Sequence, residues 1–499
     1  MKNKSLVFLF ILTAFNFLIL QSNILAQQND GKEFQDWLKQ KQEKIAKDRQ
    51  EFENFVTKRD QEFNGFLKKR WEEFEAYSGI KLYKEPKPDK LPVVDDAVDS
   101  QPKKNLVIET PDLTPQDIID IVPSASPKFE AKELSLGFFG QKIVLNVPAT
   151  IYELDLRNEL KEQVYADNWI KMSSGIDPEF IKDLQKIKSE LKLNDWGYAI
   201  LIQDVVKSIY TDQRSTMLSW FLLNKSGLKT RIGHSNNKEV FIMIAPSVTI
   251  YSMPYYILGE KKDKFFPVSD FKDPYKTKVK KIKTYGAEYP GKQSTYNLSF
   301  TSAPTFGNSK PFNRKVEFPF QDKNYKFSVG LNQNILDYMK TVPLSEFDVY
   351  YSSTISQAAF ETAISKLYEF SKEMDEVTKL NFLLRFTQKF TEYKTDEEQF
   401  GREYYMFPDQ VMYFSYSDCD DRVSLFSYLV RRLTRNQIIY LRYPDHIATA
   451  VSLKKKTTGD TVKHKGKAFY VADPTYIGAD LGMTMPMYKE VEPEIIVIN

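Results

Sequence analysis

The residues in this chain that could do chemistry are few, since its 499 amino acids include one cysteine and three histidines. Cys419 is followed 27 positions later by His446, and Asp473 comes 27 positions after that. A cysteine becomes a nucleophile when a histidine takes its proton, and a carboxylate can orient that histidine. The pattern predicts Cys419 as nucleophile, His446 as base and Asp473 as orienting group. The alternatives are a structural histidine and an aspartate that caps the turn before Pro474.

A helix is predicted to carry the cysteine. Residues 419–433 place Leu425, Phe426, Leu429 and Leu433 on one face, which is typical of an amphipathic helix. Cys419 would then lie at the helix N-terminus, where the helix dipole lowers the pKa of a thiol. The acidic residues at 420 and 421 oppose this effect, so a nearby imidazolium would be needed to keep the thiolate at neutral pH.

Two strands are predicted to carry the other members of the triad. His446 precedes a run of small and β-branched residues, 447–451, and the aromatic run 469–472 ends at Asp473 before a proline. The polar, lysine-rich stretch between the runs predicts a hairpin whose antiparallel strands hold His446 beside Asp473. His464, which lies among lysines, is predicted to be a solvated loop residue.

The residues around the triad resemble the transglutaminase-like superfamily, in its secreted bacterial form. The resemblance is carried by residues 417–422 (Ser-Asp-Cys-Asp-Asp-Arg), by the phrase around His446 and by residues 471–475, and it is strong over about 380–486. It implies a papain-like core, a helix packed on an antiparallel sheet, and acyl transfer through a Cys419 thioester onto water or an amine of a protein or peptide. Gln410, Tyr413 and Tyr416 are candidates for completing the oxyanion hole.

The N-terminal part predicts export. Two lysines precede the apolar run 6–20, so residues 1–26 have the pattern of a signal peptide, and we expect a secreted or periplasmic protein. Residues 27–84 are charged with periodic aromatics and predict an amphipathic helical segment. This segment could pack on its own protein, or bind an envelope protein or membrane surface through residues 30–80. Residues 85–130, rich in Pro, Asp and Lys, predict a linker.

The rest of the chain reads as one plan used twice. We expect a degenerate transglutaminase-like domain at 131–275, a linker at 276–310 and an intact domain at 311–499. In the first copy Thr211 stands in place of Cys419, and Glu239 stands near the position of His446. The first copy would therefore serve as structure or as a binding surface. The fold class expected is α+β, duplicated, with an N-terminal helical segment.

Composition excludes several classes of function. The formal charge is +3, and the runs of Lys and Arg typical of nucleic-acid binding are missing. Nucleotide-binding glycine motifs are missing as well, and the scattered histidines and single cysteine lack the spacing of a zinc site, so no cofactor and no metal is expected. No apolar run after the signal is long enough for a transmembrane helix. The expectation is a thiol amidohydrolase, peptidase or acyltransferase. The alternative is a non-catalytic envelope binding or assembly protein that retains the fold.

Overall fold

The structure is a computed structural model that describes residues 31–69, 71–77, 130–236, 238–307 and 311–498. The chain divides into two compact units, residues 1–63 and residues 64–499. The described residues of the first unit belong to one continuous helix, α2 (Gly31–Leu67), whose last turn falls in the second unit. The expected signal peptide (1–26) and almost all of the expected linker (85–130) lie outside the described residues. No helix in the described part of the chain combines the length and apolar character needed to cross a membrane.

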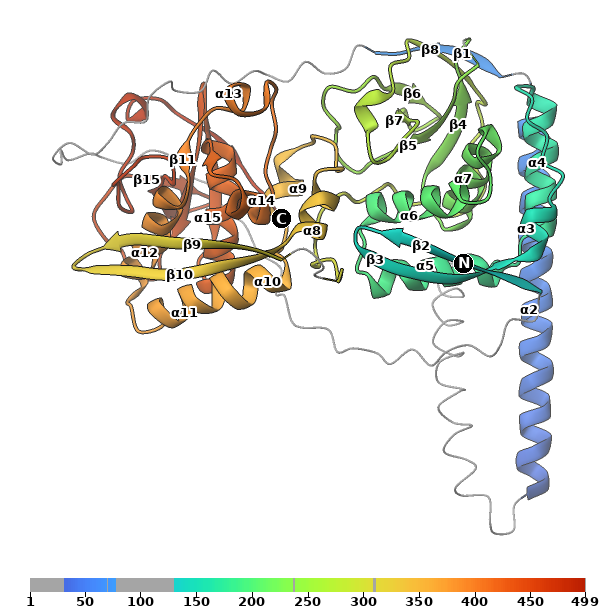
Figure 1. Cartoon of the computed structure of the whole chain (residues 1–499), viewed down its shortest axis with the longest axis horizontal. Helices are drawn as coiled ribbons and strands as arrows, with labels where there is room; N and C mark the ends of the chain where they lie inside the picture. The colour runs from blue at the N-terminus through green and yellow to red at the C-terminus, as the bar shows by residue number, and fades with distance from the viewer. Residues whose placement is uncertain (1–30, 70, 78–129, 237, 308–310, 499) are drawn as a thin grey trace. The chain divides into compact units, whose positions relative to one another are not determined.

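The second unit contains two halves built in the same order: a β-hairpin, a set of helices, then an antiparallel sheet (Figure 1). The elements of the first half are β1 (Glu72–Glu75), β2 (Ala131–Phe138), β3 (Gln141–Pro148), α3 (Ala149–Glu153), α4 (Glu162–Gly175), α5 (Pro178–Glu190), α6 (Asp195–Lys207), α7 (Gln213–Lys225), β4 (Thr230–His234), β5 (Val240–Ile244), β6 (Tyr256–Leu258), β7 (Asp263–Val268), η1 (Pro274–Lys276) and β8 (Lys281–Thr284).

The second half repeats this order with extra short elements before its last long helix. Its elements are β9 (Pro311–Phe320), β10 (Lys323–Asn332), α8 (Gln333–Met339), α9 (Phe347–Tyr351), α10 (Gln357–Ala359), η2 (Phe360–Ile364), α11 (Ser365–Ser371), α12 (Glu376–Phe390), β11 (Glu392–Tyr393), α13 (Asp396–Phe400), α14 (Pro408–Tyr413), β12 (Tyr416–Ser417), α15 (Cys419–Leu433), β13 (Ile438–Tyr443), β14 (His446–Ser452), β15 (Thr461–His464), β16 (Lys467–Ala472), η3 (Pro486–Tyr488) and β17 (Glu494–Ile496).

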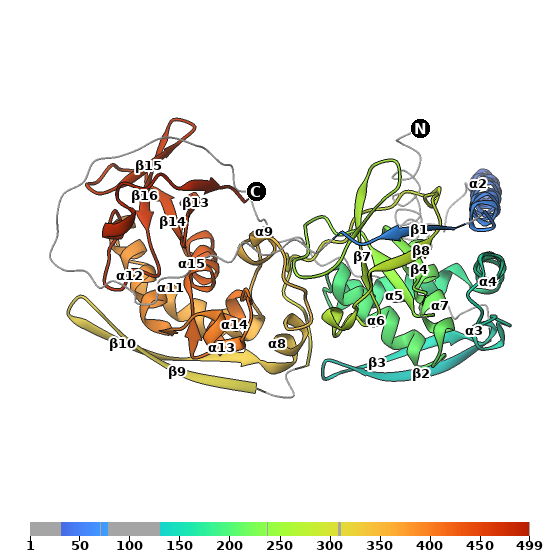
Figure 2. The ribbon, with the colours of Figure 1, turned by 90° about the horizontal axis from the view of Figure 1, so that it is seen from above.

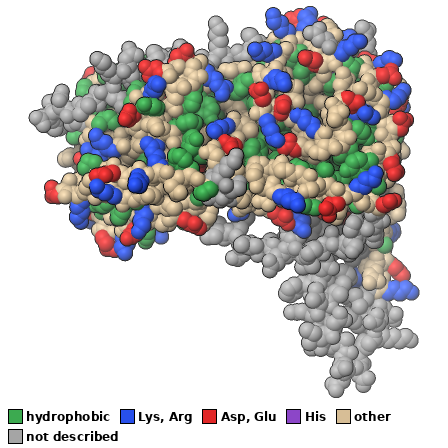
Figure 3. Space-filling view, in the orientation of Figure 1, with side chains coloured by type: hydrophobic (Ala, Val, Ile, Leu, Met, Phe, Trp, Pro, Cys, Tyr) green, Lys and Arg blue, Asp and Glu red, His purple; other side chains and the backbone are tan. Residues whose placement is uncertain are grey.

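Each half has three layers, with the helices between the hairpin and the sheet (Figures 1 and 2). In the first half α5 and α6 contact the hairpin β2–β3, and α7 packs on β4 and β5. In the second half α12 contacts β9, and α15 packs on β13 and β14. The protein is therefore a mixed α+β protein whose main sheets are antiparallel, as the sequence predicted. Acidic and basic side chains are interspersed on the face shown in Figure 3, in keeping with the nearly balanced charge.

The two sheets have the same strand order. The first runs β8-β4-β5-β7-β6 and the second β17-β13-β14-β16-β15, with antiparallel pairing between all neighbours. The first sheet carries one additional strand, β1, outside β8. The halves thus correspond strand for strand. That they arose by duplication stays a prediction.

The boundaries of the first half differ from those expected. β1 pairs with β8 in the register Glu72↔Thr284, so residues before the expected start at 131 belong to this sheet. The segment expected as a linker at 276–310 contains β8 itself, and the side chains of Tyr285 and Tyr296 are buried. Strand pairing over about 200 residues cannot be read from local composition, which suggested a helical segment and a linker at these places.

Helix α15 has the predicted bounds but a different environment. Every residue from Cys419 to Val430 is buried, so the helix is enclosed on all sides through most of its length. Sheet strands cover one side, and α9, α12 and α14 cover others. The sequence predicted an amphipathic helix from the apolar face alone. The extra short elements between α12 and α15 supply much of the additional cover.

Candidate active site

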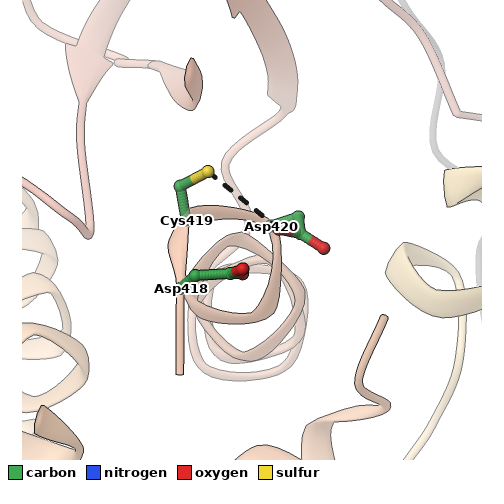
Figure 4. Close-up of side chains that lie close together, drawn as sticks. All are labelled: Asp418, Cys419 and Asp420. Atoms are coloured by element: carbon green, nitrogen blue, oxygen red, sulfur yellow. Dashed lines mark hydrogen bonds between the residues drawn. The ribbon is translucent and has the colours of Figure 1, made fainter. Parts of the chain in front are cut away.

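Cys419 is the first residue of α15, with Asp418 at the N-cap position. Its side chain is fully buried. The Sγ atom lies 4.0 Å from Oδ1 of Asp420, close enough for a weak hydrogen bond in which the thiol donates (Figure 4). Such a contact favours the protonated thiol, because a carboxylate accepts the proton that a thiolate lacks.

The charged residues after the cysteine fix the start of the helix. The carboxylate of Asp421 accepts from the backbone N–H of Met406 at 2.9 Å and from that of Asp418 at 3.3 Å. Arg422, which is buried, donates from Nη2 to the carbonyl of Thr391 at 2.9 Å. Burial lowers the pKa of Arg422 to about 10, against the opposing effect of the nearby acidic groups. The guanidinium remains charged at neutral pH and offsets part of the negative charge at this helix start.

His446 and Asp473 are brought together as the sequence predicted. His446 Nε2 lies 2.8 Å from Asp473 Oδ2, and both side chains are buried. The register of β14 and β16 pairs Thr449 with Ala472, so the next position places Asp473 opposite Ala448. His446, two residues before Ala448, is then the diagonal neighbour of Asp473 on the same face. Because Nε2 donates to the carboxylate, the neutral imidazole presents Nδ1 as an acceptor. Among the described residues, Nδ1 has no hydrogen-bond partner, so no thiol–imidazole hydrogen bond is formed in this state.

The strands do not form the simple hairpin that was expected. β15 lies between β14 and β16 in the sequence but pairs on the outer side of β16. His464 ends β15 and is buried, so its assignment to a solvated loop was wrong. The burial pattern of β15 explains this result, since Val462 and His464 turn inward while Lys463 is exposed. The neighbouring lysines suggested solvent where a period-two strand alternates its faces.

Asp473 is held by more than the histidine. Its Oδ1 accepts from the backbone N–H groups of Thr475 at 2.8 Å and Tyr476 at 3.3 Å. Gln388 of α12 donates from Nε2 to the backbone carbonyl of Asp473 at 3.3 Å. Asp473 therefore both caps the turn that follows β16 and contacts His446. The turn-capping role that the sequence offered as an alternative is therefore compatible with the contact to His446.

Tyr488 of η3 was missed from the sequence. Its ring stacks on His446 with centroids 5.4 Å apart and planes at 11°, and its hydroxyl donates to Oδ1 of Asp445 at 2.7 Å. Burial raises the pKa of Tyr488, as do the contact with Asp445 and, more weakly, nearby Cys419 and Asp473. Tyr488 thus stacks on one member of the predicted triad, and the charges of the other two influence its pKa. The run around it, Met-Pro-Met-Tyr-Lys, carries no signal of such a role.

The candidates for the oxyanion hole are engaged elsewhere. The amide of Gln410 donates to the hydroxyl of Tyr404 at 2.5 Å and accepts from the backbone of Phe407 at 3.1 Å. Tyr413 packs on an aromatic ring of β9, with centroids 4.8 Å apart. Tyr416 is 37% exposed and lies beneath the ammonium of a lysine. None of the three is assigned to an oxyanion hole.

The first half lacks the chemical groups at the corresponding positions. Ile242 pairs with Val268 as Thr449 pairs with Ala472, so Glu239 takes the register position of His446 and Ser269 that of Asp473. Thr211 is exposed and precedes the helix α7, whose N-cap is Asp212. It therefore does not occupy a helix start as Cys419 does.

One contact of the site is nevertheless kept in both halves. Gln203 of α6 donates to the backbone carbonyl of Ser269 at 3.0 Å, as Gln388 of α12 does to that of Asp473. The oxygen of each glutamine amide accepts a backbone N–H from the same following loop, that of Phe271 or Gly478. The two glutamines therefore fix the ends of β7 and β16 in the same way.

Acidic residues gather beside the cysteine. Asp396, Glu403 and Asp420 each place a carboxylate oxygen within 4.8 Å of the other two, a spacing that a divalent cation could bridge. Asp396 also accepts from the backbone N–H of Tyr404 at 2.8 Å. Among the residues that the structure describes, nothing besides these acidic side chains points to a cation, so no metal is assigned.

Comparison with known proteins leaves the family open. No protein-family model matches the chain, and searches of characterised proteins and of solved structures likewise give no match. The functional conclusion therefore depends on the geometry of the site.

Proposed function

We propose that this protein is an exported thiol enzyme of the transglutaminase-like kind, with a papain-like core, that hydrolyses amide or peptide bonds or cross-links proteins by acyl transfer. The observation that supports it best is the hydrogen-bonded pair of His446 and Asp473. Among the described residues, Nδ1 of His446 has no hydrogen-bond partner, and the helix that packs on its strand begins at Cys419. A thiol, a base and an orienting carboxylate are the groups that thioester chemistry requires.

The roles follow from the atoms. Asp473 holds the proton on Nε2 of His446, so Nδ1 accepts the thiol proton as Sγ attacks the carbonyl carbon of an amide. The backbone N–H of Cys419, at the first position of the helix, is suited to stabilise the oxyanion. The C–N bond then breaks, and the imidazolium gives its proton to the leaving amine. Water or a second amine attacks the thioester, and the thiol is regenerated.

The proposal requires the site to open. Cys419 and His446 are fully buried, and the thiol donates to Asp420 and not to the imidazole. Binding of a substrate must therefore displace part of the cover and turn Sγ towards Nδ1. Tyr488, which stacks on the imidazole, belongs to that cover.

Labelling with a thiol-directed acyl probe at neutral pH tests the proposal. We expect labelling of the natural protein, none with Cys419→Ala, and a strong loss with His446→Ala. His464→Ala is the matched control, because His464 is also a buried histidine on a strand of the same sheet. Absence of labelling in the natural protein, or equal losses in the two histidine variants, would contradict the catalytic role.

The buried thiol also supports a second candidate, a non-catalytic binding or assembly protein of the cell envelope. Pull-down from envelope extracts would compare Cys419→Ala with a protein that lacks residues 31–63. The deletion ends at 63 because the second unit begins at Asn64 and includes β1. Binding that ignores the cysteine and needs the helix would favour this second candidate over the enzyme.

A further inference from the structure

A pocket lies where the two halves of the second unit meet. It has a volume of about 90 Å³, room for one small side chain or a terminal group. The first half contributes the segment from Lys272 to Tyr275, and the second contributes Tyr350, Arg402 and Tyr404 among others. The halves are joined directly beside it, because the backbone N–H of Leu344 donates to the hydroxyl of Tyr275 at 2.7 Å. The half that lacks the triad thus forms one wall of this pocket.

Arg402 is the cation of the pocket whose charge is unpaired. Its guanidinium lies over the rings of Tyr275 and Tyr404, 5.3 and 5.7 Å from their centroids, and has no ion pair among the described residues. The other cations of the lining are neutralised, Lys272 by Asp204 at 2.7 Å and Lys340 by Asp337 at 3.1 Å. Arg402 is exposed, and a guanidinium that lies over two aromatic rings keeps its planar set of N–H donors available to a carboxylate.

The pocket borders the proposed thiol site. Glu403, which lines it, has a carboxylate oxygen within 4.8 Å of one of Asp420, and Asp420 Oδ1 lies 4.0 Å from Cys419 Sγ. The backbone beside the pocket also holds the helix start, since the N–H of Met406 donates to Asp421. The lining of the pocket is therefore connected to the buried Cys419 through the side chains of Glu403 and Asp420.

We propose that this pocket binds a free carboxylate of a peptide substrate, with Arg402 as the specificity-determining residue and Tyr275 of the first half as its support. The proposal rests on the proposed function for the fate of the peptide, but not for its binding. The carboxylate is the C-terminal group or an acidic side chain. Asp273, an exposed acid of the lining, makes a free amine the opposite outcome to test.

Retention of peptide pools tests this proposal without turnover. Cys419→Ala protein is equilibrated with pooled N-acetylated tripeptides that have a free C-terminus, an amidated one, or an amidated one with a central glutamate, and with unacetylated amides. Peptides kept on ultrafiltration are quantified by mass spectrometry. We expect retention about tenfold higher for a pool with a carboxylate, lost in Arg402→Met and kept in Arg435→Met, an exposed arginine outside the pocket. The pool that is retained identifies the source of the carboxylate.

Equal retention of all pools, a preference for the unacetylated amides, or a carboxylate preference that survives Arg402→Met would overturn the inference. Acyl-probe labelling of the natural protein separates its failure from that of the proposed function. Labelling without a carboxylate preference rejects the pocket and keeps the enzyme. A preference that depends on Arg402 in a protein that is never labelled keeps the pocket and rejects the enzyme.

Discussion

Replacing Asp473 by asparagine separates the role of this residue in chemistry from its role in stability. The carboxylate accepts from His446 through Oδ2 and from the backbone of Thr475 and Tyr476 through Oδ1. An asparagine oxygen can keep the two backbone bonds. Its NH₂ group would then donate to Nε2 of His446, so the imidazole proton moves to Nδ1 and the histidine can no longer accept the thiol proton.

The two costs differ in size. A hydrogen bond to a charged group contributes about 1.5–3 kcal/mol and a neutral one about 0.5–1.5 kcal/mol, so the variant should lose about 1–2 kcal/mol of stability. The wrong tautomer should slow labelling of Cys419 by roughly 10³- to 10⁴-fold, the scale known for an equivalent change in a serine protease triad.

Two measurements test the variant. Urea denaturation, followed by tryptophan fluorescence and by circular dichroism, gives the change in stability, and the rate of Cys419 labelling gives the change in reactivity. All five tryptophans precede residue 221, so tryptophan fluorescence does not report on the second half, whereas circular dichroism reports on both. We expect Asp473→Asn to shift the transition seen by circular dichroism, and the tryptophan transition to shift with it if the two halves of the second unit unfold together. A labelling rate within threefold of the natural protein would refute the reasoning, because Asp473 would then not set the tautomer of His446.

Three further changes test the surroundings of the site. Burial raises the pKa of Asp409 from 3.8 to about 6. The contribution of Asp409 to the free energy of unfolding is therefore fully present below pH 3.8 and is lost as the pH rises through about 6. Asp409→Asn should remove up to about 3 kcal/mol of this pH dependence, measured by urea denaturation between pH 4 and 8. A Cβ on Gly482, which has φ +86°, would lie 2.8 Å from Cα of Gly459, so Gly482→Ala should lower the free energy of unfolding by about 2–5 kcal/mol. Gly466 has φ +81° but open space around it, so Gly466→Ala should lower it by only about 1–2 kcal/mol. Similar losses of stability in the two variants would contradict the steric argument. Tyr488→Ala should speed alkylation of Cys419 by iodoacetamide at least tenfold, and Tyr488→Phe, which loses only the bond to Asp445, should speed it less; an unchanged rate with alanine would mean that Tyr488 does not limit access.

The sequence predicted those parts of the site that local patterns determine. The bounds of α15 follow from a polar N-cap position before a periodic apolar run. The start of β14 follows from a run of small and β-branched residues after His446, and the end of β16 from an aromatic run that stops at Asp473. The pairing of His446 with Asp473 could be predicted because neighbouring antiparallel strands place their ends side by side.

The remaining features depend on contacts between distant parts of the chain. The stacking of Tyr488 on His446 joins residues 42 positions apart through a turn that no periodicity marks. The hydrogen bonds of Gln410 join α14 to the short loop before it, and Asp421 holds that loop through the backbone of Met406. Sequence alone therefore suggested an oxyanion donor where there is a structural amide. The burial of Cys419 arises from cover on several sides of α15, which a single helical pattern cannot show.

The strand β1 has a consequence for the solubility of the protein. It has four residues, of which Glu72, Glu73 and Glu75 are acidic, and it lies at the end of the first sheet. Lys281 of β8 pairs with Glu75 at 2.8 Å. A short, charged outer strand deters other chains from adding to a sheet, since a new strand would have to approach like charges. A shortened protein that began at residue 131 would uncover the backbone of β8, and we expect it to self-associate into aggregates.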